Sequence, residues 1–198
     1  MDHDLIVKNI SRRIKLSGEE IEFFTQKLNF RKIRRRQYIL QEGDICRHYT
    51  FVNSGCLRLY HVDALGAEHI LQFAVDDWWV ADIGSFHDEL PSKLFIDALE
   101  PSEIFQIEKK DLIQAYVTHP LFDRVFRVLV ERAFIALQKR VLQNIGSTAE
   151  EKYLTFIETY PQLASRLPQT QIASYIGITP EFLSKIRKNL SRKNVVNY

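Results

Sequence analysis

One polar surface near the carboxyl end of the chain has the residue types and spacing that DNA recognition needs. Glu181, Ser184, Lys185 and Lys188 recur three or four positions apart, so they share one face if the segment is helical. A basic side chain can donate to guanine or to a phosphate, and a glutamate can accept from the amino group of cytosine. We therefore interpret this face as a candidate DNA-binding surface, with Arg187 beside it.

The helix that would carry this surface has a full set of start signals. The hydroxyl of Thr179 can accept from a free N–H of the first turn, and Pro180 falls where a helix needs no N–H. Ile178 and Leu183 are placed to form a hydrophobic staple. Gly177 can adopt the positive φ that ends a preceding helix. The pattern predicts a helix-turn-helix, whose second helix enters the major groove; an ordinary helical hairpin with a solvated basic face is the alternative.

The bulk composition is typical of a soluble globular protein. The 198 residues are 45% hydrophobic and 26% charged, with a net charge of +2. From Thr179 onward the chain has five basic residues and one acidic residue. This concentrates positive charge where phosphates would bind. Cys46 and Cys56 are too few for a disulfide framework and are expected to be buried thiols. Neither a signal peptide nor a membrane-spanning run is recognised, so we expect a cytoplasmic protein.

The middle of the chain has the period of β-strands. Runs with this period are expected at residues 49–52, 56–62, 69–73, 96–99 and 103–107. Turns fall at Ser54-Gly55 and at residues 63–66. Short strands separated by frequent turns predict an antiparallel sandwich or barrel. The basic run at residues 31–36 is expected to be a solvated edge, with a contact to nucleic acid as the alternative.

A long helix is predicted from His119-Pro120 to Gly146, because nothing breaks the pattern between them. Its apolar residues form two stripes, one of Phe126, Val130, Phe134, Leu137 and Val141 and the other of Phe122, Val125, Leu129 and Ala136. We expect one stripe to pack on the β-domain and the other on a second copy of the chain. Burial of the whole helix within one monomer is the alternative.

Two capping boxes mark further helix starts, one at Ser17 with Glu20 and one at Ser147 with Glu150. The first begins a helix before the β region. The second places a boundary near Gly146, after which short helices lead into the helix-turn-helix.

Taken together, these motifs resemble the cyclic-AMP receptor protein and fumarate-nitrate regulator (Crp/Fnr) superfamily. The resemblance covers nearly the whole chain and is carried by residues 40–44, residues 51–58 and residues 172–186. It implies an α+β fold with an N-terminal antiparallel β-roll of the jelly-roll, cyclic-nucleotide-binding-like type. The β-roll domain would span residues 1–118, a dimerisation helix residues 119–146, and a C-terminal (winged) helix-turn-helix residues 147–198. Members of this family are usually homodimers that control transcription.

The resemblance also assigns roles within the DNA-binding part. Glu181 and Lys185 match the main base readers, and Ser184 is a further candidate. Pro180 stands where many members have an arginine, so that contact is lost and the best-known half-site of the family is not expected. Phosphate contacts, which position without specifying, are assigned to Gln169, Thr170, Thr179, Arg187 and Lys188. Only residues 194–198 remain for a wing, so the wing is expected to be absent or rudimentary.

The nucleotide pocket of the family needs a Gly-Glu pair for the ribose and an Arg-Ser/Thr pair for the cyclic phosphate. In this chain Trp79 to Asp82 occupy the first position, and Ser92 replaces the arginine beside Lys93. Because a buried phosphate needs a paired cation, we expect no response to cyclic AMP. Another small anion near Lys93, or a pocket closed by aromatic packing, are the alternatives. The chain also has too few cysteines for an iron–sulfur sensor and no local haem signature around its histidines. We therefore expect no cofactor, no metal and no catalytic residue.

Three functions are compatible with the sequence. The first is a homodimeric regulator on double-stranded DNA, with RNA polymerase a candidate partner and an unknown effector. The second is a cupin-type metalloenzyme, which would need clustered histidines, although no His-x-His occurs. The third is a ligand-binding module acting through protein partners, whose binding would ignore salt, unlike DNA binding. We favour the first, as a non-catalytic protein that does not enter the membrane.

Overall fold

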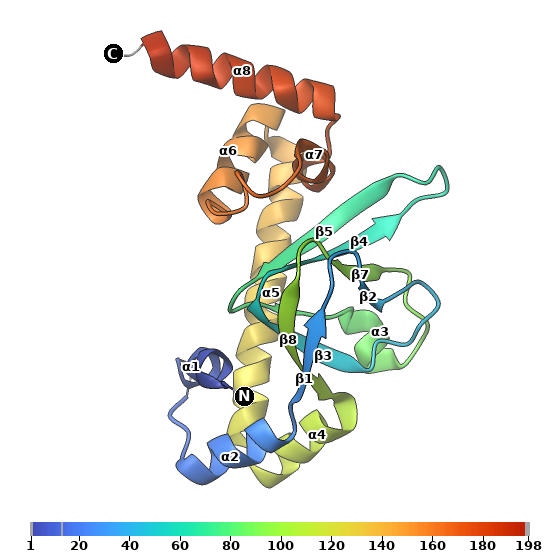
Figure 1. The fold of residues 1–198 in the computed structure, drawn as a ribbon, viewed down its shortest axis with the longest axis vertical. Helices are drawn as coiled ribbons and strands as arrows, with labels where there is room; N and C mark the ends of the chain where they lie inside the picture. Colours follow the sequence, from blue (N-terminus) through green and yellow to red (C-terminus); the bar gives the residue numbers. More distant parts are fainter. Residues whose placement is uncertain (1, 13, 197–198) are drawn as a thin grey trace. The chain divides into compact units, whose positions relative to one another are not determined.

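The computed structural model describes residues 2–12 and 14–196. They form α-helices and β-strands, which Figure 1 labels in chain order. The chain divides into two compact units, the first made of residues 1–62 and 71–131, and the second of residues 63–70 and 132–198.

Two four-stranded sheets with antiparallel pairing dominate the first unit. One sheet has the order β1 (Asn29–Ile33), β8 (Ser102–Glu108), β3 (His48–Ser54), β6 (Trp79–Val80). The other has the order β2 (Tyr38–Leu40), β7 (Phe95–Ala98), β4 (Cys56–Val62), β5 (Glu68–Val75), and residues 68–70 of β5 belong to the second unit. The structure confirms the predicted α+β class and all five predicted strand positions.

Three strands were not predicted, namely β1, β2 and β6. Strand β1 overlaps the basic run at residues 31–36, which composition alone assigns to a solvated edge. Side chains in this run nevertheless alternate between the core and solvent. Ile33 is only 2% exposed, whereas Lys32 is exposed. Lys32 forms an ion pair with Glu103 of the neighbouring strand.

The turn between β3 and β4 depends on a glycine. Gly55 has a φ of 105°, and a Cβ there would lie 2.2 Å from the hydroxyl oxygen of Ser102. That hydroxyl accepts from the backbone N–H of Cys56 at 3.2 Å. Cys46 and Cys56 are both free and buried, as expected, and burial raises the pKa of the Cys46 thiol.

Helices α1 (Asp4–Ser11), α2 (Gly18–Gln26), α3 (Ile83–Asp88) and α4 (Lys109–Thr118) complete the first unit with the start of α5 (Leu121–Gly146). The predicted box at α2 is confirmed: the Ser17 hydroxyl accepts from Glu20 N, and Glu20 accepts from Ser17 N. This backbone hydrogen bond lowers the pKa of Glu20. Phe24 of α2 stacks on Phe122 of α5 at 5.0 Å.

The two apolar stripes of α5 have different environments along its length. Phe122, Val125 and Phe126 are at most 3% exposed. Further along the helix lie apolar side chains that are 36–80% exposed, namely Val130, Phe134, Ile135, Leu137, Val141, Leu142 and Ile145. The helix therefore supplies core residues at its start and an uncovered apolar surface beyond.

The second unit contains the rest of α5 with α6 (Ala149–Thr159), α7 (Gln169–Ile176) and α8 (Pro180–Val196). The predicted capping box at Ser147 and Glu150 is wrong by one residue. Thr148 accepts from Glu151 N, and Glu151 accepts from Thr148 N at 2.7 Å. Ser147 with Glu150 and Thr148 with Glu151 both have the spacing of a capping box. Helix α6 starts with the second pair, and its residues Tyr153 and Phe156 are buried.

Candidate nucleic-acid interface

The turn between α7 and α8 has the predicted geometry. Gly177 has φ 74° and ψ 40° and ends α7. The N–H of Ile178 donates to Ala173 O at 3.0 Å, and Ala173 is fully buried. The hydroxyl of Thr179 accepts from Phe182 N at 3.2 Å, so it caps α8. The sequence signals for this turn are therefore confirmed.

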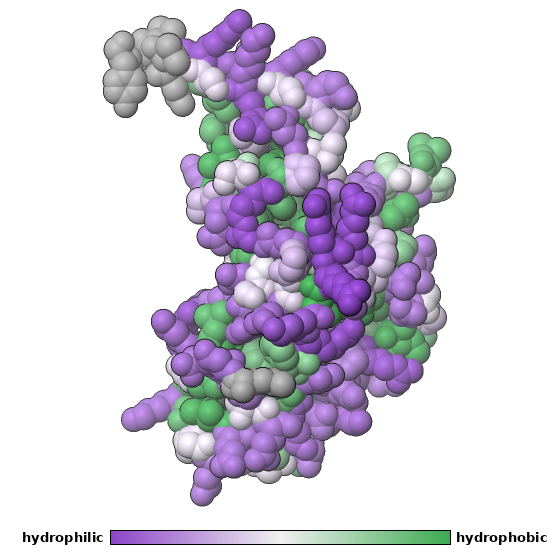
Figure 2. Space-filling view, viewed as in Figure 1, coloured by the Kyte–Doolittle hydropathy of each residue, from purple (hydrophilic) through white to green (hydrophobic). Residues whose placement is uncertain are grey.

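Helix α8 has one buried and one exposed face. Leu183 and Ile186 are 0% and 5% exposed. On the opposite face lie the exposed residues Glu181, Ser184, Lys185 and Lys188. Hydrophilic side chains cover most of α8 in Figure 2. The four polar residues thus share a surface that can present both an acceptor and cations to a groove.

The other predicted DNA-contacting residues lie around this face. Pro180 is the first residue of α8 and Thr179 its cap. Arg187 is half-buried, and it lies one helical turn after the buried Leu183, at the edge of the buried face. The division between base readers and phosphate contacts stays a prediction.

Gln169 and Thr170 are exposed at the first turn of α7. Gln169 is joined to the candidate reading surface, because the Ser184 hydroxyl donates to Gln169 Oε1 at 2.9 Å. The residue before α7 is Pro168, which gives the helix no side-chain cap.

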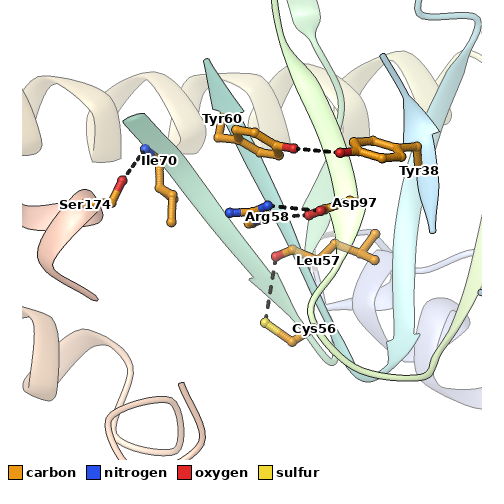
Figure 3. Close-up of polar contacts among 8 residues, drawn as sticks. All are labelled: Tyr38, Cys56, Leu57, Arg58, Tyr60, Ile70, Asp97 and Ser174. Atoms are coloured by element: carbon orange, nitrogen blue, oxygen red, sulfur yellow. Dashed lines mark hydrogen bonds and ion pairs between the residues drawn. The ribbon is translucent and has the colours of Figure 1, made fainter. Parts of the chain in front are cut away.

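Two polar residues that the sequence did not indicate hold α7 in the second unit. The hydroxyl of Ser174 accepts from Ile70 N at 3.2 Å, as Figure 3 shows, and donates to Glu68 O. Arg140 donates to Ile70 O at 2.6 Å and to Tyr175 O at 2.9 Å. Its guanidinium carbon lies 4.2 Å from the centre of the Tyr175 ring. No sequence signal could have found these contacts, since they join residues up to 106 positions apart.

Another arginine is structural. Arg58 of β4 lies opposite Asp97 of β7. Its Nε and Nη2 donate to the two carboxylate oxygens of Asp97 at 2.7 and 3.0 Å (Figure 3). The guanidinium lies over the Tyr60 ring at 4.0 Å, and the hydroxyl of Tyr60 donates to that of Tyr38 at 3.4 Å.

Two of the residues predicted for the nucleotide pocket are joined to each other. The Ser92 hydroxyl donates to Asp82 Oδ2 at 2.6 Å. Asp82 also caps α3 by accepting from Ser85 N at 3.2 Å. Ser92 accepts from Leu94 N at 2.9 Å and is 3% exposed. The positions expected to face a nucleotide thus form a local hydrogen-bonded cluster.

The other two predicted pocket residues have different surroundings. The Trp79 indole donates to Asn9 Oδ1 at 3.1 Å and packs against Phe51 and Phe126 at 5.1 and 5.4 Å. Trp79 is therefore a packing residue. The side chain of Lys93 is exposed.

Within residues 2–12 and 14–196, no group of three histidine, cysteine, aspartate or glutamate side chains is arranged to hold a metal ion. In the same part of the chain, no helix combines the length and apolar character needed to cross a bilayer.

Comparison with known proteins finds a match to one domain model and a shared fold. The model of the cyclic nucleotide-binding domain matches residues 30–119. The structure of the c-di-GMP responsive global regulator CLP of Xanthomonas campestris has a TM-score of 0.74 at 14% identity, with 90% of this chain and 93% of that chain covered. The structure of FixK2 of Bradyrhizobium japonicum has a TM-score of 0.73 at 17% identity, with 84% of this chain and 86% of that chain covered.

A putative transcriptional regulator of the Crp/Fnr family from Eubacterium rectale has a TM-score of 0.68 at 15% identity, covering 90% of this chain and 85% of that one. No curated protein sequence matches this chain significantly. Residues 30–119 match the model of the cyclic nucleotide-binding domain, and the chain shares the fold of the three solved structures named above.

Proposed function

We propose that this protein is a non-catalytic transcriptional regulator that binds double-stranded DNA as a homodimer. The observation that carries the proposal is the exposed polar face of α8, on a helix capped by Thr179. Ser184 and Lys185 each lie about one helical turn after Glu181 there, so the three side chains can follow base edges in a major groove. Lys188 and the half-buried Arg187 extend the cationic surface toward phosphates.

The homodimer is supported by the uncovered stripe of α5. Val130, Phe134, Leu137 and Val141 are all at least 36% exposed, and their spacing of four, three and four residues is that of a coiled-coil seam. A second copy of the same helix can cover this stripe. Residues 119–146 would then act as the dimerisation helix between a β-roll domain at 1–118 and a DNA-binding domain at 147–198.

We also propose that cyclic AMP does not regulate this protein. Ser92 stands where the family resemblance places the phosphate-binding arginine, and its hydroxyl donates to the Asp82 carboxylate. A cyclic phosphate would have to displace this hydrogen bond beside a carboxylate and without a paired arginine, which is electrostatically unfavourable.

The direct test is a selection of genomic fragments by the purified full chain, with and without cyclic AMP. We expect enrichment of a palindrome with half-sites about one helical turn apart. Binding should weaken steeply with added salt, since phosphate contacts release counterions, and cyclic AMP should leave the selected sites unchanged. Without enrichment in either condition the DNA-binding proposal fails, whereas enrichment that depends on cyclic AMP would overturn only the effector proposal.

A further inference from the structure

A polar cleft in the first unit is not explained by the DNA-reading surface. It has a volume of about 470 Å³, and both sheets line it. Arg31, Thr50 and Gln106 come from one sheet, and Leu40 and Ile96 from the other. Its described lining does not include the four residues predicted for the nucleotide pocket.

Three polar side chains form a hydrogen-bonded row on the core-facing side of the first sheet. Nη1 of Arg31 donates to Gln106 Oε1 at 2.9 Å, and Gln106 Nε2 donates to Thr50 Oγ1 at 3.1 Å. Gln106 and Thr50, which face each other across β8 and β3, are each 2% exposed. Arg31 has the same strand parity as the buried Ile33. The row therefore brings a cation to the core-facing side of this sheet.

Positive charge predominates in the cleft. Its lining contains Arg31 and Arg47 against the carboxylate of Asp44, which accepts from the backbone N–H of Gln41. Among residues 2–12 and 14–196, no carboxylate lies within ion-pair distance of either arginine, although Glu89 and Glu108 interact with Arg47 at longer range. His48 also lines the cleft, but burial lowers its pKa, so its ring adds no positive charge at neutral pH.

The opposite wall of the cleft is apolar, with Ile39, Leu40 and Ile96 contributed by β2 and β7. The volume lies within the range of small-molecule sites, which combine apolar walls with a few polar groups that orient the ligand. We propose that this cleft binds a small organic anion. Its charged group pairs with Arg31 and Arg47, and its apolar part lies against the isoleucine and leucine side chains. The site does not depend on DNA binding.

The test is isothermal titration of the full chain, without DNA, with octanoate, phenylacetate and phenyl phosphate as probes. Octanol and benzyl alcohol are the neutral counterparts. We expect at least one of the anions to bind about tenfold or more tightly than the neutral compounds, because only the anions form charge-assisted hydrogen bonds with the arginines.

Two variants locate the site. Arg47→Gln changes an exposed residue at the rim, and Arg31→Met removes the inner cation while keeping an unbranched side chain that replaces the aliphatic part of the arginine. Each variant should lower the affinity for the anion by about tenfold or more. Arg35→Gln, an exposed arginine outside the cleft, and Lys93→Gln, in the predicted nucleotide pocket, are the matched controls and should bind as the unmodified chain does.

Circular dichroism melts would show whether Arg31→Met is folded, and the Arg47→Gln result stands independently of that outcome. The proposal is overturned if none of the three anions binds, or if anions and neutral compounds bind alike. It is also overturned if Lys93→Gln rather than Arg47→Gln abolishes binding. None of these results would affect the DNA-binding proposal, which the fragment selection tests separately.

Discussion

The hydroxyl of Ser184 donates to Gln169 Oε1 at 2.9 Å, which joins the candidate reading helix to the first turn of α7. From the sequence we expect Ser184 to contact a base edge and Gln169 to contact a phosphate. Their hydrogen bond uses the one proton of the hydroxyl, so Ser184 in this arrangement can only accept from a base. The amide N–H₂ of Gln169 is then the donor available to a phosphate.

Lys185→Ala should relax base preference at one position of the half-site and cost about 1–3 kcal/mol of binding free energy. Lys185 is exposed on the reading face of α8, and a lysine discriminates by donating to guanine. Arg187→Ala is the matched comparison, because the half-buried Arg187 is assigned to a phosphate and its loss should weaken all sequences alike. Sequence selection with each variant measures both effects. Uniform weakening by Lys185→Ala would remove it from the base readers.

Phe134→Glu should convert a dimer into a monomer. Phe134 is 58% exposed in the stripe that we propose a second copy covers, and a carboxylate there would be desolvated on association. Light scattering coupled to gel filtration measures the mass. Leu65→Glu is the control, since Leu65 is 94% exposed outside the stripe and its change should leave the dimer intact. A dimer that persists in Phe134→Glu would place the interface elsewhere.

Local signals explain how much of this fold could be predicted from sequence. Gly177 and Thr179 determine a turn through their own backbone and capping preferences, and both have the predicted roles. The capping box after α5 was displaced by one residue because Ser147 and Thr148 both have a glutamate three positions later. Local spacing cannot choose between them; packing of the helix does.

Contacts between distant segments account for what could not be predicted. The inward direction of Arg31 depends on the register of β1 with β8, more than 70 positions away. A run of six residues with five positive charges gave no indication of that pairing. In the same way, Asp82 and Ser92 were each recognised as pocket positions, but their mutual hydrogen bond depends on the path of the chain around α3.

Arg140→Gln should loosen α7 within the second unit. Arg140 donates to the backbone oxygens of Ile70 and Tyr175, and losing a charged donor from partly buried acceptors costs about 1–3 kcal/mol. Native-state hydrogen exchange should report this loss as a lower opening free energy for residues 169–176. Lys139→Gln, an exposed neighbour on the same helix, should leave the exchange unchanged. Equal protection in both variants would show that Arg140 does not hold α7.

The hairpin turn at residues 63–66 should resist acid. The His69 side chain hydrogen-bonds to the Asp63 carboxylate, and with the N–H groups of Ala67 and Leu65 it lowers the pKa of Asp63 to about 2. An unfolded aspartate titrates at about 3.9. The stabilising contribution is therefore fully present above about pH 4 and is lost as pH falls through about 2.

Carbon-detected NMR titration of the Asp63 carboxyl measures this directly. His69→Gln should raise the pKa of Asp63 only part of the way toward 3.9, because the two backbone donors remain. A pKa near 3.9 in the unmodified chain would contradict the observed geometry.

The first turns of α7 and α8 differ in the backbone N–H groups that they leave without a side-chain cap. Thr179 satisfies one N–H of α8 and Pro180 has none to offer, whereas α7 begins after Pro168 without a side-chain cap. The backbone of Gln169 and Thr170 therefore offers donors that no substitution of their side chains removes. If DNA phosphate lies there, its anchoring would survive Gln169→Ala and Thr170→Ala together, and would be insensitive to any chemical modification of lysine.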